Sequence, residues 1–86
     1  MLLRFTKHAQ EKFAILKKHS FLVTRRQVTN AVLKPDLIDH SRLPLHIAQK
    51  TIDDTHVLRV VYKREGRIKV IITFYPGRKS SYEKRK

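Results

Sequence analysis

The sequence contains no cysteine, only two glycines, and only seven acidic residues among 86. Without cysteine, the chain has neither disulfides nor thiolate zinc sites. With so few glycines, it has no glycine-rich loop of the kind that cradles phosphates. Its longest uncharged runs are far shorter than the roughly 20 residues that a membrane-spanning helix needs, and the start MLLRFTKH lacks the apolar segment of a signal peptide. We therefore expect a cytoplasmic protein without membrane contact.

Positive charge is abundant, because 20 lysines and arginines stand against the seven acids and give a net charge of +13. A solvated surface of the thermophile kind usually mixes both signs. An excess this large favours nucleic acid, anionic lipid or an acidic protein as the partner. The length and the 41% hydrophobic content suit one modest core. We expect a single domain over residues 1–86, in which residues 77–86 form a basic C-terminal tail.

The first 35 residues predict a short strand followed by two helices. Residues 2–5 alternate weakly, and Thr6 is a suitable N-cap for a helix over residues 7–18. Apolar residues recur along one stripe of that helix with the 3.6-residue period. Thr24 opens a capping-box pattern before a second helix, and Pro35 requires that this helix end near residue 34.

The rest of the chain alternates with the period of β-strands. Residues 45–51 can form a strand, and the segment before them is a loop or an irregular edge strand. Residues 56–75 form the clearest element, a hairpin with two alternating arms. A three-residue loop, 64–66, with Gly66 left-handed keeps the apolar residues on one face. That register pairs Tyr62 with Ile68, Val60 with Val70, and Leu58 with Ile72.

The expected fold class is therefore α+β, with two N-terminal helices packed on one face of a twisted, mostly antiparallel sheet of three or four strands. The opposite face would carry Arg59, Lys63, Arg67, Lys69, Thr73 and Tyr75, alongside Val57, Val61 and Ile71. Cations that contact phosphates, next to aromatic rings that stack on bases, suit single-stranded RNA. A solvated face covered by the C-terminal tail or by a second subunit is the alternative. The predicted RNA-binding residues are Lys63, Arg67, Lys69, Lys79, Lys84 and Arg85.

Two stretches, FTKHAQEKF and LRVVYKREGRIKVIITFYPGRKSSYEK, resemble small proteins of the RelE/ParE toxin superfamily, in a branch near the BrnT toxins. The resemblance covers nearly the whole chain. It implies a RelE-like fold, metal-independent cleavage of messenger RNA, some of it ribosome-bound, and inhibition by an acidic or extended antitoxin protein. ParE-type relatives instead act on gyrase.

The positions that match this branch are His8, Arg59, Tyr75 and Arg78, whereas Lys12 stands where the branch often has arginine. The predicted catalytic residues are the four matching positions and Tyr82. RNA cleavage needs stabilisation of the phosphorane charge, which Arg59, Lys69 or Arg78 can supply. It also needs proton transfer, for which Tyr75, Tyr82 and His56 are candidates.

The five histidines do not form a metal-site pattern, because no two are spaced i, i+4 on one helix and no carboxylate cluster accompanies them. We therefore expect neither a metal nor another cofactor. Two other hypotheses stay open beside the ribonuclease. One is a module that binds RNA without cleaving it, and the other is a protein that docks an acidic partner at a sheet edge. Whether the protein forms a homodimer is left open.

Overall fold

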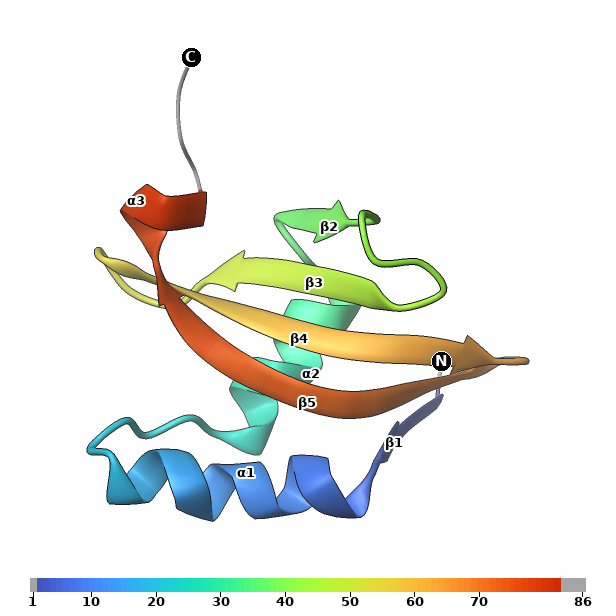
Figure 1. Cartoon of the computed structure of the whole chain (residues 1–86), viewed down its shortest axis with the longest axis horizontal. Coiled ribbons are helices and arrows are strands. Elements are labelled where there is room, and N and C mark those ends of the chain that lie inside the picture. The colour runs from blue at the N-terminus through green and yellow to red at the C-terminus, as the bar shows by residue number, and fades with distance from the viewer. Residues whose placement is uncertain (1, 83–86) are drawn as a thin grey trace.

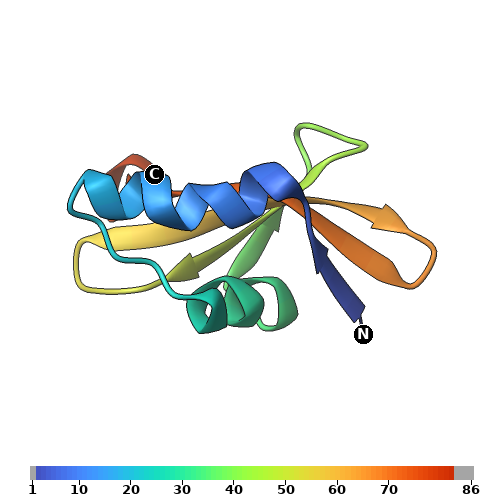
Figure 2. The same cartoon turned by 90° about the horizontal axis from the view of Figure 1, so that it is seen from below.

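The computed structural model describes residues 2–82 and shows an α+β fold built on an open, mixed, five-stranded sheet (Figure 1). Its elements are β1 (Leu2–Phe5), α1 (Lys7–Lys18), α2 (Arg25–Leu33), β2 (Leu37–Asp39), β3 (His46–Thr51), β4 (His56–Glu65), β5 (Ile68–Arg78) and α3 (Lys79–Tyr82). The strand order is β1-β5-β4-β3-β2. Helix α1 lies along β5, and α2 lies against β3 and β4 (Figures 1 and 2). None of the helices in residues 2–82 is long and apolar enough to cross a bilayer.

The two predicted helices form within a residue of their expected bounds, because their caps are local. The Thr6 hydroxyl accepts a hydrogen bond from the backbone N–H of Ala9 at 3.1 Å. Thr24 and Gln27 form both bonds of a capping box. Helix α2 ends at Leu33, as the proline at 35 requires.

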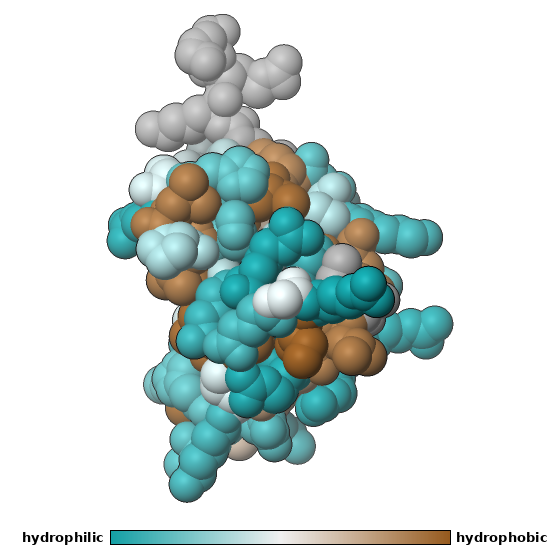
Figure 3. All heavy atoms as spheres, turned by 90° about the vertical axis from the view of Figure 1, so that its right-hand side faces the viewer, coloured by the Kyte–Doolittle hydropathy of each residue, from teal (hydrophilic) through white to brown (hydrophobic). Residues whose placement is uncertain are grey.

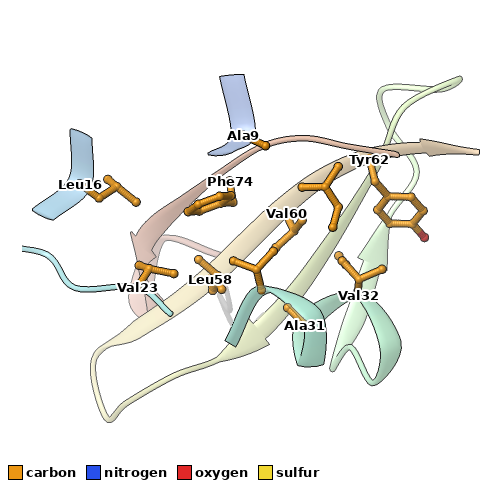
Figure 4. Packing of buried hydrophobic residues seen from close by; sticks show 12 residues of the cluster. Ala9, Leu16, Val23, Ala31, Val32, Leu58, Val60, Tyr62 and Phe74 are labelled. Carbon is orange, nitrogen blue, oxygen red and sulfur yellow. The ribbon is translucent and has the colours of Figure 1, made fainter. Parts of the chain in front are cut away.

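The core lies between these helices and one face of the sheet (Figure 4). Helix α1 contributes Ala9 and Leu16, and the sheet contributes Leu58, Val60 and Phe74. The contribution of α2 is Val28, Ala31 and Val32. Burial of each large apolar side chain stabilises the fold by about 1.5–3 kcal/mol. Because the apolar residues of β4 alternate onto one face, the helices cover that face.

The hairpin differs from the prediction in its loop and in its register. Gly66 has a positive φ of 63°, as expected, but the loop has two residues, because Glu65 pairs with Ile68. Glycine at the first loop position suits a tight two-residue turn. Further along, Tyr62 pairs with Ile71 and Val61 pairs with Thr73, so that the residue at 72 has no partner on β4. The predicted register is therefore wrong, and β5 contains a bulge.

The start of α1 binds this bulge. Thr6 donates its backbone N–H to the Ile71 carbonyl at 3.0 Å and its hydroxyl to the Ile72 carbonyl at 3.2 Å. The extra residue reverses the alternation of β5. Ile71 is fully buried in the core, and Lys69 lies over the ring of Tyr62 on the same face. The expectation that Ile71 and Lys69 share a face with Arg59 is therefore wrong.

The sheet is also larger than expected. β1 pairs in parallel with β5, which makes the sheet mixed. β2 adds an edge strand beside β3. The predicted hairpin ended at residue 75, but β5 continues through Pro76 and Gly77 to Arg78. Much of the predicted basic tail therefore belongs to β5 and α3, while the predicted Lys84 and Arg85 lie outside the described residues.

Candidate functional site

Arg59 lies at the centre of the sheet face that α1 and α2 leave uncovered. Its cross-strand neighbours are Gln49 on β3 and Tyr75 on β5. The guanidinium donates from Nε to the Tyr75 hydroxyl at 3.1 Å and from Nη1 to the Gln49 side-chain oxygen. Its Nη2 donates to Oδ2 of Asp39, on β2, at 2.9 Å. Arg59 is only 6% exposed, so these bonds compensate a charge that is almost wholly buried.

A depression of about 520 Å³ lies beside this arginine. We call it the Arg59 depression, and it is lined by Asp39, Ser41, Arg42, Leu45, Ile47, Arg59, Val61, Tyr75 and Tyr82. Tyr82, on α3, places its ring centre 4.3 Å from the guanidinium carbon of Arg59. A side chain at Gly77 would collide with that ring. The missing side chain of Gly77 therefore allows Tyr82 to lie over Arg59.

The charges of Asp39 and Arg59 neutralise each other at this site. Hydrogen bonds from Ser41, and then from Arg59, hold the pKa of Asp39 well below its usual value. Burial lowers the pKa of Arg59, but the hydrogen bonds to Tyr75 and Asp39 outweigh this effect and raise the pKa above its usual value. An ionised Asp39 therefore neutralises Arg59 and leaves little of its charge for a substrate phosphate. The cation at the surface of the depression is the exposed Arg42.

Three of the five predicted catalytic residues come together here, namely Arg59, Tyr75 and Tyr82. His8, on α1, lies beside the same sheet face, where its Nε2 is 3.2 Å from the Thr73 hydroxyl. Thr73 and Tyr75 are two residues apart on β5, a separation of about 6.6 Å along a strand. Arg78 is not part of this group, because it pairs with His56 at the start of β4 and lines a different pocket.

The predicted RNA-binding residues do not form one surface. Lys63 forms an ion pair with Glu65 at 3.0 Å. Arg67 lies in the hairpin turn, and Lys69 lies on the helix-covered face. Lys79 lines the pocket that Arg78 also lines. The cations are thus spread over both faces and both ends of the hairpin.

The sequence interpretation missed Asp39 and Arg42. Both belong to the segment Asp39–Arg42 at the end of β2, where Asp39 also accepts a hydrogen bond from the Ser41 backbone at 2.8 Å. Residues of this kind are typical of turns, and nothing in their spacing connects them to an arginine 20 positions later. Only the pairing of β2 with β3, and of β3 with β4, brings them to Arg59.

The histidines are similarly dispersed. His40 and His46 contact each other through their Nδ1 atoms at 3.3 Å. His56 contacts the Asp53 carboxylate at 3.1 Å. Within residues 2–82, no three histidine or acidic side chains gather as metal ligands would.

Comparison with known proteins adds no family to this description. No family model, no curated protein and no solved structure matches the chain.

Proposed function

We propose that this protein acts on RNA in the cytoplasm as a metal-independent endoribonuclease of the toxin type, and that the Arg59 depression is its cleavage site. One observation carries the proposal. A buried, hydrogen-bonded arginine positions the phenol of Tyr75 at the wall of a depression. Tyr82 and Arg42 line the same depression. The net charge of +13 supports an RNA substrate, and the resemblance to RelE-like toxins supports the reaction and an antitoxin partner.

The proposed chemistry uses the phenols for proton transfer. The Tyr75 oxygen accepts a hydrogen bond from the Arg59 guanidinium, which fixes its position as the proposed base. That base would remove the proton of a ribose 2′-hydroxyl, whose oxygen then attacks the adjacent phosphorus. The bond from phosphorus to the 5′-oxygen breaks, and Tyr82 would donate the proton to this leaving oxygen. The products would be a 2′,3′-cyclic phosphate and a 5′-hydroxyl end.

Arg59 has a positioning role in this scheme, because all three of its donating nitrogens already have partners within the protein. The exposed Arg42 is better placed to stabilise negative charge that develops on the phosphate. This assignment differs from the sequence-based expectation, which named Arg59, Lys69 and Arg78 as candidates for the charge-stabilising role.

The test is an assay of purified protein on RNA, with and without ribosomes. Removal of a general acid–base group typically lowers the rate about 10²–10⁴-fold, so Tyr75→Phe should lower the cleavage rate by that factor. Tyr62→Phe is the matched control, because Tyr62 is a buried phenol on the opposite face. Unchanged cleavage by Tyr75→Phe, or an equal loss in Tyr62→Phe, would contradict the assigned site.

A second candidate is RNA binding without cleavage. The observation that favours it is the ion pair of Asp39 with Arg59, which neutralises the arginine that the sequence motifs assigned to catalysis. Arg78 also favours it, because this predicted catalytic residue lines a different pocket and not the Arg59 depression. Intact RNA in the assay, together with an affinity that falls by about 0.7 of a log unit per log of salt for each phosphate contact, would select this candidate.

A further inference from the structure

The hairpin end of the molecule contains a second cavity, far along β4 from Arg59. Its volume is about 460 Å³, and we call it the tip pocket. It is lined by Leu2, Arg64, Gly66, Arg67 and Lys69. Figure 3 faces this end of the molecule and shows a mostly hydrophilic surface with interspersed apolar residues. Three of the five lining residues are cations, and none is an acid.

These cations lack acidic partners among residues 2–82. The one acid of the hairpin, Glu65, forms ion pairs with Lys63 at 3.0 Å and with Arg4 at 3.1 Å. Arg64, Arg67 and Lys69 form no ion pair with any described carboxylate. The hairpin therefore separates its charges into one paired group and one unpaired group.

Like charges gather close to the inner wall of the pocket. The Lys69 ammonium is 5.2 Å from the ring centre of Tyr62, and the His46 ring stacks on the same phenol at 5.2 Å. Burial and the nearby Arg64 lower the pKa of Lys69. Burial and the charges of His40, Arg64 and Lys69 lower the pKa of His46. An anion in the pocket would relieve this repulsion.

We propose that the tip pocket binds a phosphate group. Two guanidinium groups and an ammonium offer several charged donors, and arginine forks match the oxygens of a phosphate. The pocket does not offer an aromatic face for a base, since the ring of Tyr62 lies between the imidazole from β3 and the ammonium from β5. The ligand is therefore recognised by its charge and not by a base. This proposal does not depend on cleavage at the Arg59 depression.

The experiment is an NMR titration of the whole chain with inorganic phosphate, with sodium chloride at equal ionic strength as the reference. Phosphate should shift the backbone signals of Arg64, Arg67 and Lys69 in a saturable way, and it should raise the pKa of His46. Hydrogen bonds to charged groups contribute enough that the loss of one weakens binding about tenfold or more. Lys69→Gln and Arg67→Gln should each weaken phosphate binding by that factor.

Arg4→Gln is the matched control, because it removes a nearby cation that is already paired with Glu65. It should leave phosphate binding within about twofold of the parent protein, because its charge is already compensated. Arg67 is exposed in the turn, so its variant tests the site even if Lys69→Gln does not fold. Shifts that chloride reproduces, or equal weakening in Arg4→Gln, would overturn the proposal.

The source of the phosphate is resolved by two further ligands. A short oligoribonucleotide with a 5′-phosphate and the same oligonucleotide without it should be titrated in parallel. A terminal phosphate as ligand predicts tip-pocket shifts with the first only, whereas a backbone phosphate predicts them with both. The absence of tip-pocket shifts with inorganic phosphate and with both oligonucleotides would reject the site, even in a protein that cleaves RNA.

Discussion

Arg59 and Arg64 are five residues apart on β4, yet they belong to two regions of opposite character. Arg59 points to the uncovered face, where its charge is buried and hydrogen-bonded to Asp39, Gln49 and Tyr75. Arg64 points to the other face, where it lines the tip pocket without an acidic partner in residues 2–82. The odd spacing places the two on opposite faces of one strand.

This contrast shows that a count of cations does not reveal how much charge a ligand meets. A buried ion pair fixes the positions of neighbouring groups, and the loss of one partner destabilises the fold because the other charge is left uncompensated. Exposed and unpaired cations attract anions and contribute little to stability. We therefore assign the Arg59 depression to positioning and proton transfer, and the tip pocket to charge recognition.

The largest expected effect is the loss of Arg59 itself. Arg59→Leu leaves Oδ2 of Asp39 and the side-chain oxygen of the buried Gln49 without the hydrogen bonds that Arg59 donates to them. Breaking a buried ion pair costs about 3–5 kcal/mol, and we expect the free energy of unfolding in urea to fall by that amount. Arg42→Gln, an exposed residue of the same depression, should change it by less than about 0.5 kcal/mol. If Arg59→Leu lowered the free energy of unfolding as little as Arg42→Gln, the contrast between a buried, paired arginine and exposed, unpaired ones would be wrong.

A smaller loss of stability is expected when Asp39 is replaced or when acid protonates it. The pKa of Asp39 is lower in the folded protein than in the unfolded chain, so its contribution is complete above about pH 4, the unfolded pKa. That contribution is lost as the pH falls further, toward the folded pKa. Asp39→Asn should lower the free energy of unfolding at pH 7 by about 1–3 kcal/mol and flatten its decline in acid. Asp54→Asn, at an exposed turn, should change the free energy of unfolding at pH 7 by less than about 0.5 kcal/mol.

Gly77→Ala should alter the Arg59 depression while leaving the fold intact. The added methyl group collides only with the ring end of Tyr82, which can move aside. We expect the free energy of unfolding to fall by no more than about 2 kcal/mol, because a cation–π contact with a desolvated cation contributes about that amount. RNA cleavage should fall, and the NMR signals of the Tyr82 ring should shift. Full cleavage with a displaced ring would show that Tyr82 has no part in the reaction.

The smallest effect concerns the tip pocket. The charge of Arg64 lowers the pKa of His46, after the larger effects of burial and of His40. Arg64→Gln should therefore raise the pKa of His46 slightly, as measured by NMR titration of the histidine ring. The matched variant Lys63→Gln, on the opposite face, should not. A pKa that falls in Arg64→Gln would contradict the like-charge arrangement of the pocket.

The local elements were predictable, because their signals lie within a few residues of one another. Thr6 and Thr24 cap helices through bonds three residues along the chain. The alternation of β4 identified Leu58, Val60 and Tyr62 as core residues, which the structure confirms. The left-handed Gly66 was also predicted correctly. The convergence of Arg59 and Tyr75 followed from alternation as well, although the register that led to it was wrong.

The sequence by itself determined the two helices, the two long arms of the hairpin and the excess of positive charge, since periodicity, capping and composition are local or additive properties. Only the tertiary structure decided where β5 would bulge, because the hydrogen bonds of Thr6 to the Ile71 and Ile72 carbonyls cross 65 or more residues. That one bulge moved Lys69 to the helix-covered face. Strand pairing across β2, β3 and β4 likewise brought Asp39 to Arg59. Long-range packing therefore decided which cations are neutralised and which remain available to a ligand.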